Sequence, residues 1–172
     1  MSVANEPAGY TGTQILLHWT IAVLIVLQLV IGEDIKPAYR AFSRGTEPAA
    51  GDVFNANIHV YVGLAVLALA IWRIAARLRD GVPAPPPEES VLLKRIGAAA
   101  HFLLYLFIFG MPITGALAWY FSFRAMGDIH DLAKPVIIVV VGLHAAGALW
   151  QHFIVKSDVL ARMLRPAGRR AR

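Results

Sequence analysis

Four long apolar stretches, separated by polar segments, divide the chain. They cover about residues 15–31, 58–72, 96–121 and 136–155. A helix needs about 20 apolar residues to cross the hydrocarbon core of a bilayer, and the second stretch reaches that length if Arg73 extends its side chain to the interface. The pattern therefore predicts four transmembrane helices, over about residues 14–32, 56–78, 95–122 and 129–155.

The apolar stretches require a lipid environment, and that environment determines the fold class. Lipid offers no partner for main-chain polar groups, so a spanning segment with this pattern is expected to be helical. We expect an all-α fold, an integral membrane four-helix bundle, in a single domain of residues 1–172. Residues 32–55 are expected to form a polar loop and residues 79–94 a proline-rich linker, with Asp128 as the N-cap of the last helix.

Composition supports a membrane protein and excludes several cofactor classes. The chain is 58% hydrophobic, whereas soluble domains are about 45–50% apolar. It contains no cysteine, which excludes disulfides, cysteine-bound zinc or iron–sulfur centres and c-type haem attachment. Residues 1–13 carry no basic side chain, so we expect no cleavable signal peptide.

The basic residues indicate the orientation in the membrane. They lie at the ends of the apolar stretches and are not interleaved with aromatic residues on one face, so the net charge of +5 does not indicate nucleic acid. Eleven of them flank one side of the predicted bundle and five, Lys36, Arg40, Arg44, Arg124 and Lys134, flank the other. The positive-inside rule therefore predicts that both termini are cytoplasmic.

All six histidines lie inside or at the end of an apolar stretch. An ionisable side chain in a membrane span is costly and usually functional, and neutral imidazole is a standard axial ligand of haem iron. A haem-binding protein is therefore the leading interpretation. The histidines are His18, His59, His101, His130, His144 and His152.

Spacing places these histidines at two depths. His130 and His144 are fourteen residues apart, which on a helix is about 21 Å along the axis with side chains about 40° apart. One helix face thus offers a ligand to each half of the membrane. His59 is at a depth that suits His130, and His18 lies in the same half as His144, so four histidines from three helices would bind two irons.

Several alternatives stay open at this point. His101 or His152 could oppose His18 in place of His144, and Met111 and Met126 are conceivable axial ligands, although isolated methionines usually serve packing. Intramembrane histidines also serve haem-free metal or proton transport. Glycines inside the spans either allow close helix packing or leave room for a flat macrocycle. These are Gly63, Gly97, Gly110, Gly115, Gly142 and Gly147.

Four segments carry a resemblance to a known family. They are LLHW around His18, NIHVYVGL around His59, AHFLLYLFIFGMPITG in the third span and GLHAAGALWQHF around His144. With these segments the chain resembles the bacterial cytochrome b561 family over about residues 13–165. Its short length and the tail KSDVLARMLRP look most like the superoxide oxidases of that family.

The resemblance implies a set of ligands. It implies that His18 and His144 hold a cytoplasmic haem b, and that His59 and His130 hold an outer haem b. It also implies that Arg73 pairs with a haem propionate, a role that suits a guanidinium. His101 matches a recurring family position near a propionate, a haem or a quinone and is not one of the four axial ligands.

The resemblance also implies a function. We expect transmembrane electron transfer through two b haems in a bacterial inner membrane, with superoxide oxidised outside and ubiquinone reduced. The alternative is a cytochrome b subunit that passes electrons between a partner dehydrogenase or soluble donor and the quinone pool. The outer side does not carry a net positive charge to steer an anion, because its five basic residues face six acidic ones. The acidic residues are Glu33, Asp34, Glu47, Asp52, Asp128 and Asp131.

Overall fold

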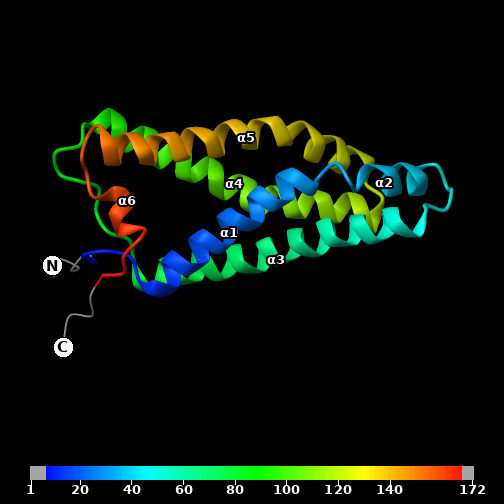
Figure 1. Cartoon of the computed structure of the whole chain (residues 1–172), viewed down its shortest axis with the longest axis horizontal. Coiled ribbons are helices and arrows are strands. Elements are labelled where there is room, and N and C mark those ends of the chain that lie inside the picture. The colour runs from blue at the N-terminus through cyan, green and yellow to red at the C-terminus, as the bar shows by residue number, and fades with distance from the viewer. Residues whose placement is uncertain (1–6, 168–172) are drawn as a thin grey trace.

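The computed structural model describes residues 7–167, and all regular elements in that range are helices (Figure 1). This confirms the predicted all-α fold. Four of the helices are long and apolar enough to cross a membrane. In chain order the helices are α1 (Gly12–Ile31), α2 (Lys36–Ser43), α3 (Ala50–Asp80), α4 (Val91–Phe121), α5 (Arg124–Phe153) and α6 (Val159–Arg162).

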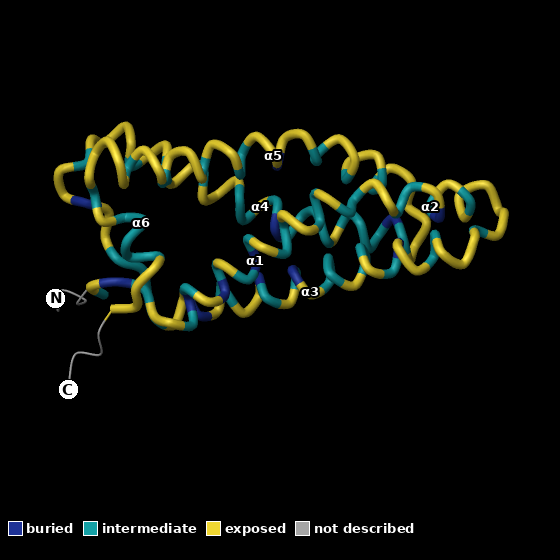
Figure 2. The backbone as a smooth tube through the Cα atoms, in the orientation of Figure 1, coloured by how far each residue is buried: buried dark blue, intermediate teal, exposed yellow. Residues whose placement is uncertain are grey.

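The four long helices pack in sequence order. Helix α1 packs on α3, α3 on α4 and α4 on α5, whereas α1 and α5 have little direct contact within the described residues. A small core joins α1, α3 and α4 through Ile21, Val66, Ala70 and Ile108. Most other large apolar side chains are exposed, and Figure 2 shows exposed positions along every long helix. Apolar exposure on this scale requires lipid around the bundle.

Local sequence signals explain where two of the spans begin. Thr11 caps α1 by accepting a hydrogen bond from the amide of Gln14, and the Gln14 side chain bonds the amide of Thr11 in return. Ser90 caps α4 in the same way, through the amide of Leu93. Each cap satisfies main-chain donors that the first helical turn leaves without a partner.

Three spans begin earlier than the hydropathy pattern predicts. Helix α3 starts at Ala50, α4 at Val91 and α5 at Arg124. The prediction that Asp128 caps α5 was wrong, because Phe123 is the N-cap and Asp128 lies within the helix. Hydropathy marks only the part of a helix that lies in lipid, and the main-chain ladder continues into the polar interface. His59 and His130 consequently lie well inside α3 and α5 rather than at their first residues.

The predicted loop of residues 32–55 also contains a helix, so that prediction was wrong for part of its length. Helix α2 has Pro37 in its first turn, buries Ala38 completely and places the Phe42 ring against Trp119 of α4, with ring centroids 5.4 Å apart. A helix of eight residues is not stable alone in water. It forms because it packs on the bundle, which local sequence does not reveal.

The two ends of the described chain lie together. The amide of Ala167 donates to the carbonyl oxygen of Tyr10 at 3.0 Å, and the Trp19 indole donates to the carbonyl oxygen of Met163 at 2.8 Å. An even number of spans brings both ends to one side of the membrane. That this side is the cytoplasm stays a prediction from the distribution of basic residues.

Candidate haem sites

Two pairs of histidines face each other across the bundle. The rings of His59 on α3 and His130 on α5 have centroids 6.1 Å apart and planes at 79°. The rings of His18 on α1 and His144 on α5 have centroids 6.2 Å apart and planes at 64°. Helix α5 therefore contributes one histidine to each pair, at two levels of the bundle.

The separation within each pair suits a shared iron. A metal–imidazole nitrogen bond is about 2.0–2.1 Å, so two imidazoles on opposite sides of one metal ion have ring centroids about 6 Å apart. Both observed separations match this value. The residues present thus fit an iron held between two imidazoles at each level.

The two remaining histidines occupy different surroundings. The ring centroid of His101 is 5.3 Å from that of His144, closer than the rings in either facing pair. His152 packs edge-to-face against Phe153 with ring centroids 4.8 Å apart and planes at 76°, and within the described residues its ring contacts no other histidine. Of the candidates to face His18, the structure brings His144 opposite it and leaves His152 at a distance.

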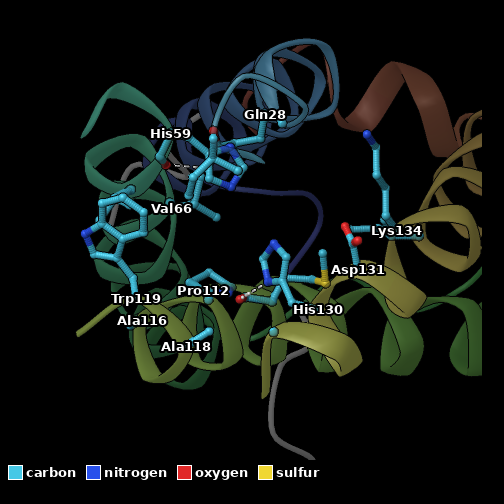
Figure 3. Close-up of a pocket in the computed structure, with 18 of the residues that line it drawn as sticks. Gln28, His59, Val66, Pro112, Ala116, Ala118, Trp119, His130, Asp131 and Lys134 are labelled. Atoms are coloured by element: carbon cyan, nitrogen blue, oxygen red, sulfur yellow. Dashed lines mark hydrogen bonds between the residues drawn. The ribbon is translucent and has the colours of Figure 1, made fainter. Parts of the chain in front are cut away.

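A cavity with largely apolar walls contains His59 and His130, the pair predicted to lie in the outer half of the membrane. Figure 3 shows His59 and His130 on opposite sides of this cavity, with Gln28 beside His59 and with Asp131 and Lys134 beside His130. An apolar cavity with a few placed polar groups is the usual form of a cofactor site. Its apolar lining includes Ile25, Leu29, Val66, Ile108, Trp119 and Ile137.

A main-chain hydrogen bond orients the His130 ring. Its Nδ1 lies 2.9 Å from the carbonyl oxygen of Met111, and the Thr114 hydroxyl lies 3.3 Å from the same nitrogen. Because a carbonyl oxygen only accepts, Nδ1 carries the proton in this bond. The other ring nitrogen, Nε2, is then unprotonated and available to bind iron. Met111, an alternative ligand on sequence grounds, takes part here through its main chain.

The opposite wall contains an unused donor and an unused acceptor. Within the described residues, Nδ1 of His59 and Oε1 of Gln28 are buried without a hydrogen-bond partner, while Nε2 of Gln28 donates to the carbonyl oxygen of His59 at 2.9 Å. A histidine that binds iron through Nε2 needs an acceptor for its Nδ1 proton. Gln28 supplies a free acceptor on the same wall. The sequence alone carries no signal for Gln28, because a single glutamine within a span has no distinctive spacing.

Glycine makes room for the His130 ring. A Cβ atom added at Gly115 would lie 3.2 Å from Cε1 of His130, and one added at Gly32 would lie 3.6 Å from Cε1 of His59. Gly115 therefore leaves space for the His130 ring, whereas at Gly32 the tight contact would be with the carbonyl oxygen of Gln28 at 2.8 Å. The other span glycines differ: at Gly63 the neighbour is Gln28, and four more would meet nothing within 4 Å. Those four are Gly97, Gly110, Gly142 and Gly147.

Arg73 lies beside His18 and His144, at the level of the second histidine pair. Its Nη1 donates to the carbonyl oxygen of Gln14 at 3.1 Å, which anchors α3 to the start of α1. Its charge lies within electrostatic range of His18, His101 and His144. A guanidinium at that place can also bind a carboxylate.

Four charged side chains form what we call the outer charge cluster: Glu33, Lys36, Asp131 and Lys134. Lys36 pairs with Glu33 at 2.8 Å and with Asp131 at 3.5 Å, and Lys134 pairs with Glu33. Hydrogen bonds from Lys134 and Lys36 lower the pKa of Glu33 to about 2. The sequence gives no signal for this cluster, because Glu33 and Lys134 are 101 residues apart.

Comparison with known proteins decides the family. The sequence profile described as prokaryotic cytochrome b561 matches residues 9–166. The chain belongs to the prokaryotic cytochrome b561 family. It is accordingly a multi-pass membrane cytochrome of bacterial type, with b-type haem, that transfers electrons across the membrane. Family membership argues against the haem-free transporter.

Named relatives match over almost their whole length. Cytochrome b562 of Cereibacter sphaeroides is 37% identical over 164 residues, which cover 95% of this chain and 99% of the relative. The probable superoxide oxidase CybB of Yersinia pestis is 27% identical, with 90% of this chain and 95% of the relative covered. Cytochrome b561 homolog 2 of Escherichia coli is 24% identical, with 95% of each chain covered.

Proposed function

We propose that the chain binds two b haems and passes electrons between them across the bilayer. The outer haem lies between His59 and His130, and the cytoplasmic haem lies between His18 and His144. The observation that carries this proposal is the separation of the rings, 6.1 Å in one pair and 6.2 Å in the other, at two levels of one bundle. No other two histidine rings in the described chain face each other at that distance.

Bound haem supplies one-electron redox chemistry, and the chain sets the conditions for it. The four histidines ligate iron, and the carbonyl oxygen of Met111 holds the His130 ring in the orientation that exposes Nε2. Apolar walls exclude water, which together with the axial ligands tunes the potential. Arg73 binds a propionate of the cytoplasmic haem, and His101 lies beside that haem without ligating it.

The two sites lie at different depths in the membrane. His130 and His144 are fourteen residues apart on one helix, a rise of about 21 Å. An electron that moves between the haems therefore crosses a large part of the hydrocarbon core. Its transfer contributes to, or works against, the membrane potential.

The first candidate for the overall reaction is superoxide oxidation coupled to ubiquinone reduction at a bacterial inner membrane. Two superoxide anions each lose one electron and become dioxygen, and ubiquinone takes up the two electrons and two protons to become ubiquinol. Two observations support it. A relative is named a probable superoxide oxidase, and two lysines, Lys36 and Lys134, line the outer cavity.

The second candidate is a cytochrome b subunit that receives electrons from a partner dehydrogenase or a soluble donor protein and passes them to quinone. The outer charge cluster favours this candidate. Glu33 and Asp131 balance the two lysines, so the outer cavity does not present the excess positive charge that would concentrate a small anion.

One experiment on the purified protein tests the conduit and separates the candidates. We expect a reduced-minus-oxidised spectrum of b-type haem with two haems per chain. Superoxide generated with ubiquinone present should then yield ubiquinol, and superoxide dismutase should abolish the yield. Haem without ubiquinol formation would favour the second candidate. Protein that folds and contains no porphyrin would overturn the proposal itself.

A further inference from the structure

The outer charge cluster lies where a reductant would approach the outer haem. Lys36, Asp131 and Lys134 line the same cavity as His59 and His130. The side chains of the two lysines are 32% and 25% exposed and those of the two acids are 56% and 61% exposed, so the cluster reaches solvent. Its charges act on any small molecule that enters the cavity from that side.

Glu33 connects parts of the bundle that otherwise hardly touch. It lies in the turn between α1 and α2, and Lys134 lies on α5, next to α1 across a seam with little direct helix contact. Figure 3 shows Lys134 and Asp131 on the wall that carries His130. The two carboxylate oxygens of Glu33 each contact a different lysine, which places its negative charge between two positive ones.

Glu33 and Asp131 together balance the two lysines of the cluster. Lys36 and Lys134 contribute +2, and Glu33 and Asp131 contribute −2, so the cluster is neutral. Asp128 lines the same cavity and adds −1, so the entrance carries −1 with Glu33 charged and no net charge without it. A charge at the entrance of a low-dielectric cavity changes the local concentration of ions and their rates of encounter.

We propose that Glu33 is a specificity-determining residue, which gives the entrance to the outer haem a net negative charge and so suppresses electron donation by small anions relative to small cations. The inference rests on the proposed outer haem between His59 and His130. In the reaction concerned, the reductant gives one electron to the ferric outer haem and leaves as its one-electron oxidised form. Glu33 acts through the field at the entrance and does not touch the reacting atoms.

The test compares two reductants of opposite charge on the haem-loaded protein. Anaerobic stopped-flow measures the rate of haem reduction by ascorbate, an anion, and by hexaammineruthenium(II), a cation. The quantity of interest is the ratio of the two rates, because a change in haem potential alters both rates in the same direction. At about 0.01 M ionic strength we expect Glu33→Gln to raise the anion-to-cation ratio roughly three- to tenfold. At about 1 M the effect should vanish, because the screening length falls to about 3 Å.

Further variants separate a local effect from a change in total charge. Glu33→Asp keeps the charge and should keep the wild-type ratio, whereas Lys134→Gln should lower the ratio. The matched control is Glu47→Gln, which removes the same charge from an exposed residue that, within the described part of the chain, forms no ion pair with Lys36 or Lys134. Its ratio should stay within about twofold of wild type.

Equal ratios in Glu33→Gln and Glu47→Gln, or an effect that persists at high salt, would overturn the role of Glu33. If Glu33→Gln does not fold, the ratio in Lys134→Gln decides, and an unchanged ratio there overturns the inference. Haem content distinguishes the two levels of failure. A protein without the outer haem contradicts the proposed function, whereas a haem-loaded protein with unchanged ratios contradicts this inference alone.

Discussion

The Nδ1 atom of His130 lies 2.9 Å from the carbonyl oxygen of Met111, one helix away. Gly115, one turn further along α4, leaves the ring uncrowded in this position, because a Cβ atom there would lie 3.2 Å from Cε1 of His130. Helix α4 therefore positions a histidine that belongs to α5, and the orientation of this proposed haem ligand depends on a helix that contributes none of the four proposed ligands.

Substitution of Gly115 tests this dependence. A Cβ atom at Gly115 would lie 3.2 Å from the His130 ring, so Gly115→Ala should displace the ring by a few tenths of an ångström. A displaced rotamer costs about 0.5–1.5 kcal/mol, which corresponds to roughly two- to tenfold weaker binding of the outer haem. Haem titration of the apoprotein measures the change. Gly110→Ala on the same helix is the control, because its Cβ would meet nothing within 4 Å. Equal affinities in the two variants would contradict the steric role.

Loss of one ligand should remove one haem. His59→Ala and His130→Ala would each leave the proposed outer iron with a single imidazole. His18 and His144 lie at another level of the bundle and should keep their haem. Haem per protein, measured as the pyridine haemochrome, should fall by half in either variant, with the second haem intact in redox titration. Unchanged haem content in both variants would refute the pairing of His59 with His130.

His101 should prove dispensable for haem binding. Its ring centroid lies 5.3 Å from that of His144, too close for a second ligand on the opposite side of one iron. His101→Ala should therefore keep both haems, and His144→Ala should lose the cytoplasmic one. The same haemochrome assay compares them. Loss of a haem in His101→Ala with full content in His18→Ala would exchange the roles of these two histidines.

The carboxyl group of Glu33 should titrate at an unusually low pH. Hydrogen bonds from Lys134 and Lys36 stabilise its ionised form and lower its pKa from 4.5 to about 2. Because the folded pKa is lowered, the stabilising contribution is complete above about pH 4.5 and is lost as the pH falls towards 2. The 13C chemical shift of the carboxyl group, assigned by its absence in Glu33→Gln, should stay constant down to about pH 4. A midpoint near 4.5 would show that the ion pairs do not form in solution.

Part of the architecture is encoded locally and could be predicted. Length and hydropathy of a stretch determine whether it can span a bilayer, so the four long helices and the all-α class follow from the chain alone. The helix repeat converts the fourteen-residue spacing of His130 and His144 into two histidines on one face, and four segments, the one around His18 among them, carry the family resemblance. Helix ends were harder to predict. The start of α5 at Arg124 lies in the polar interface, where hydropathy carries no information about helix boundaries.

The remaining features depend on contacts between distant parts of the chain. By depth, His101, His144 or His152 could face His18, and only the packing of α1, α4 and α5 places the His144 ring 6.2 Å from His18 and the His101 ring 5.3 Å from His144. Gln28 beside His59 and Glu33 between two lysines have no signature in spacing. Periodicity along one helix determines which residues share a face, whereas the relative rotation and depth of separate helices decide which faces meet. Those quantities arise from packing in three dimensions, so the chain by itself supplied the ligands and the tertiary structure selected their partners.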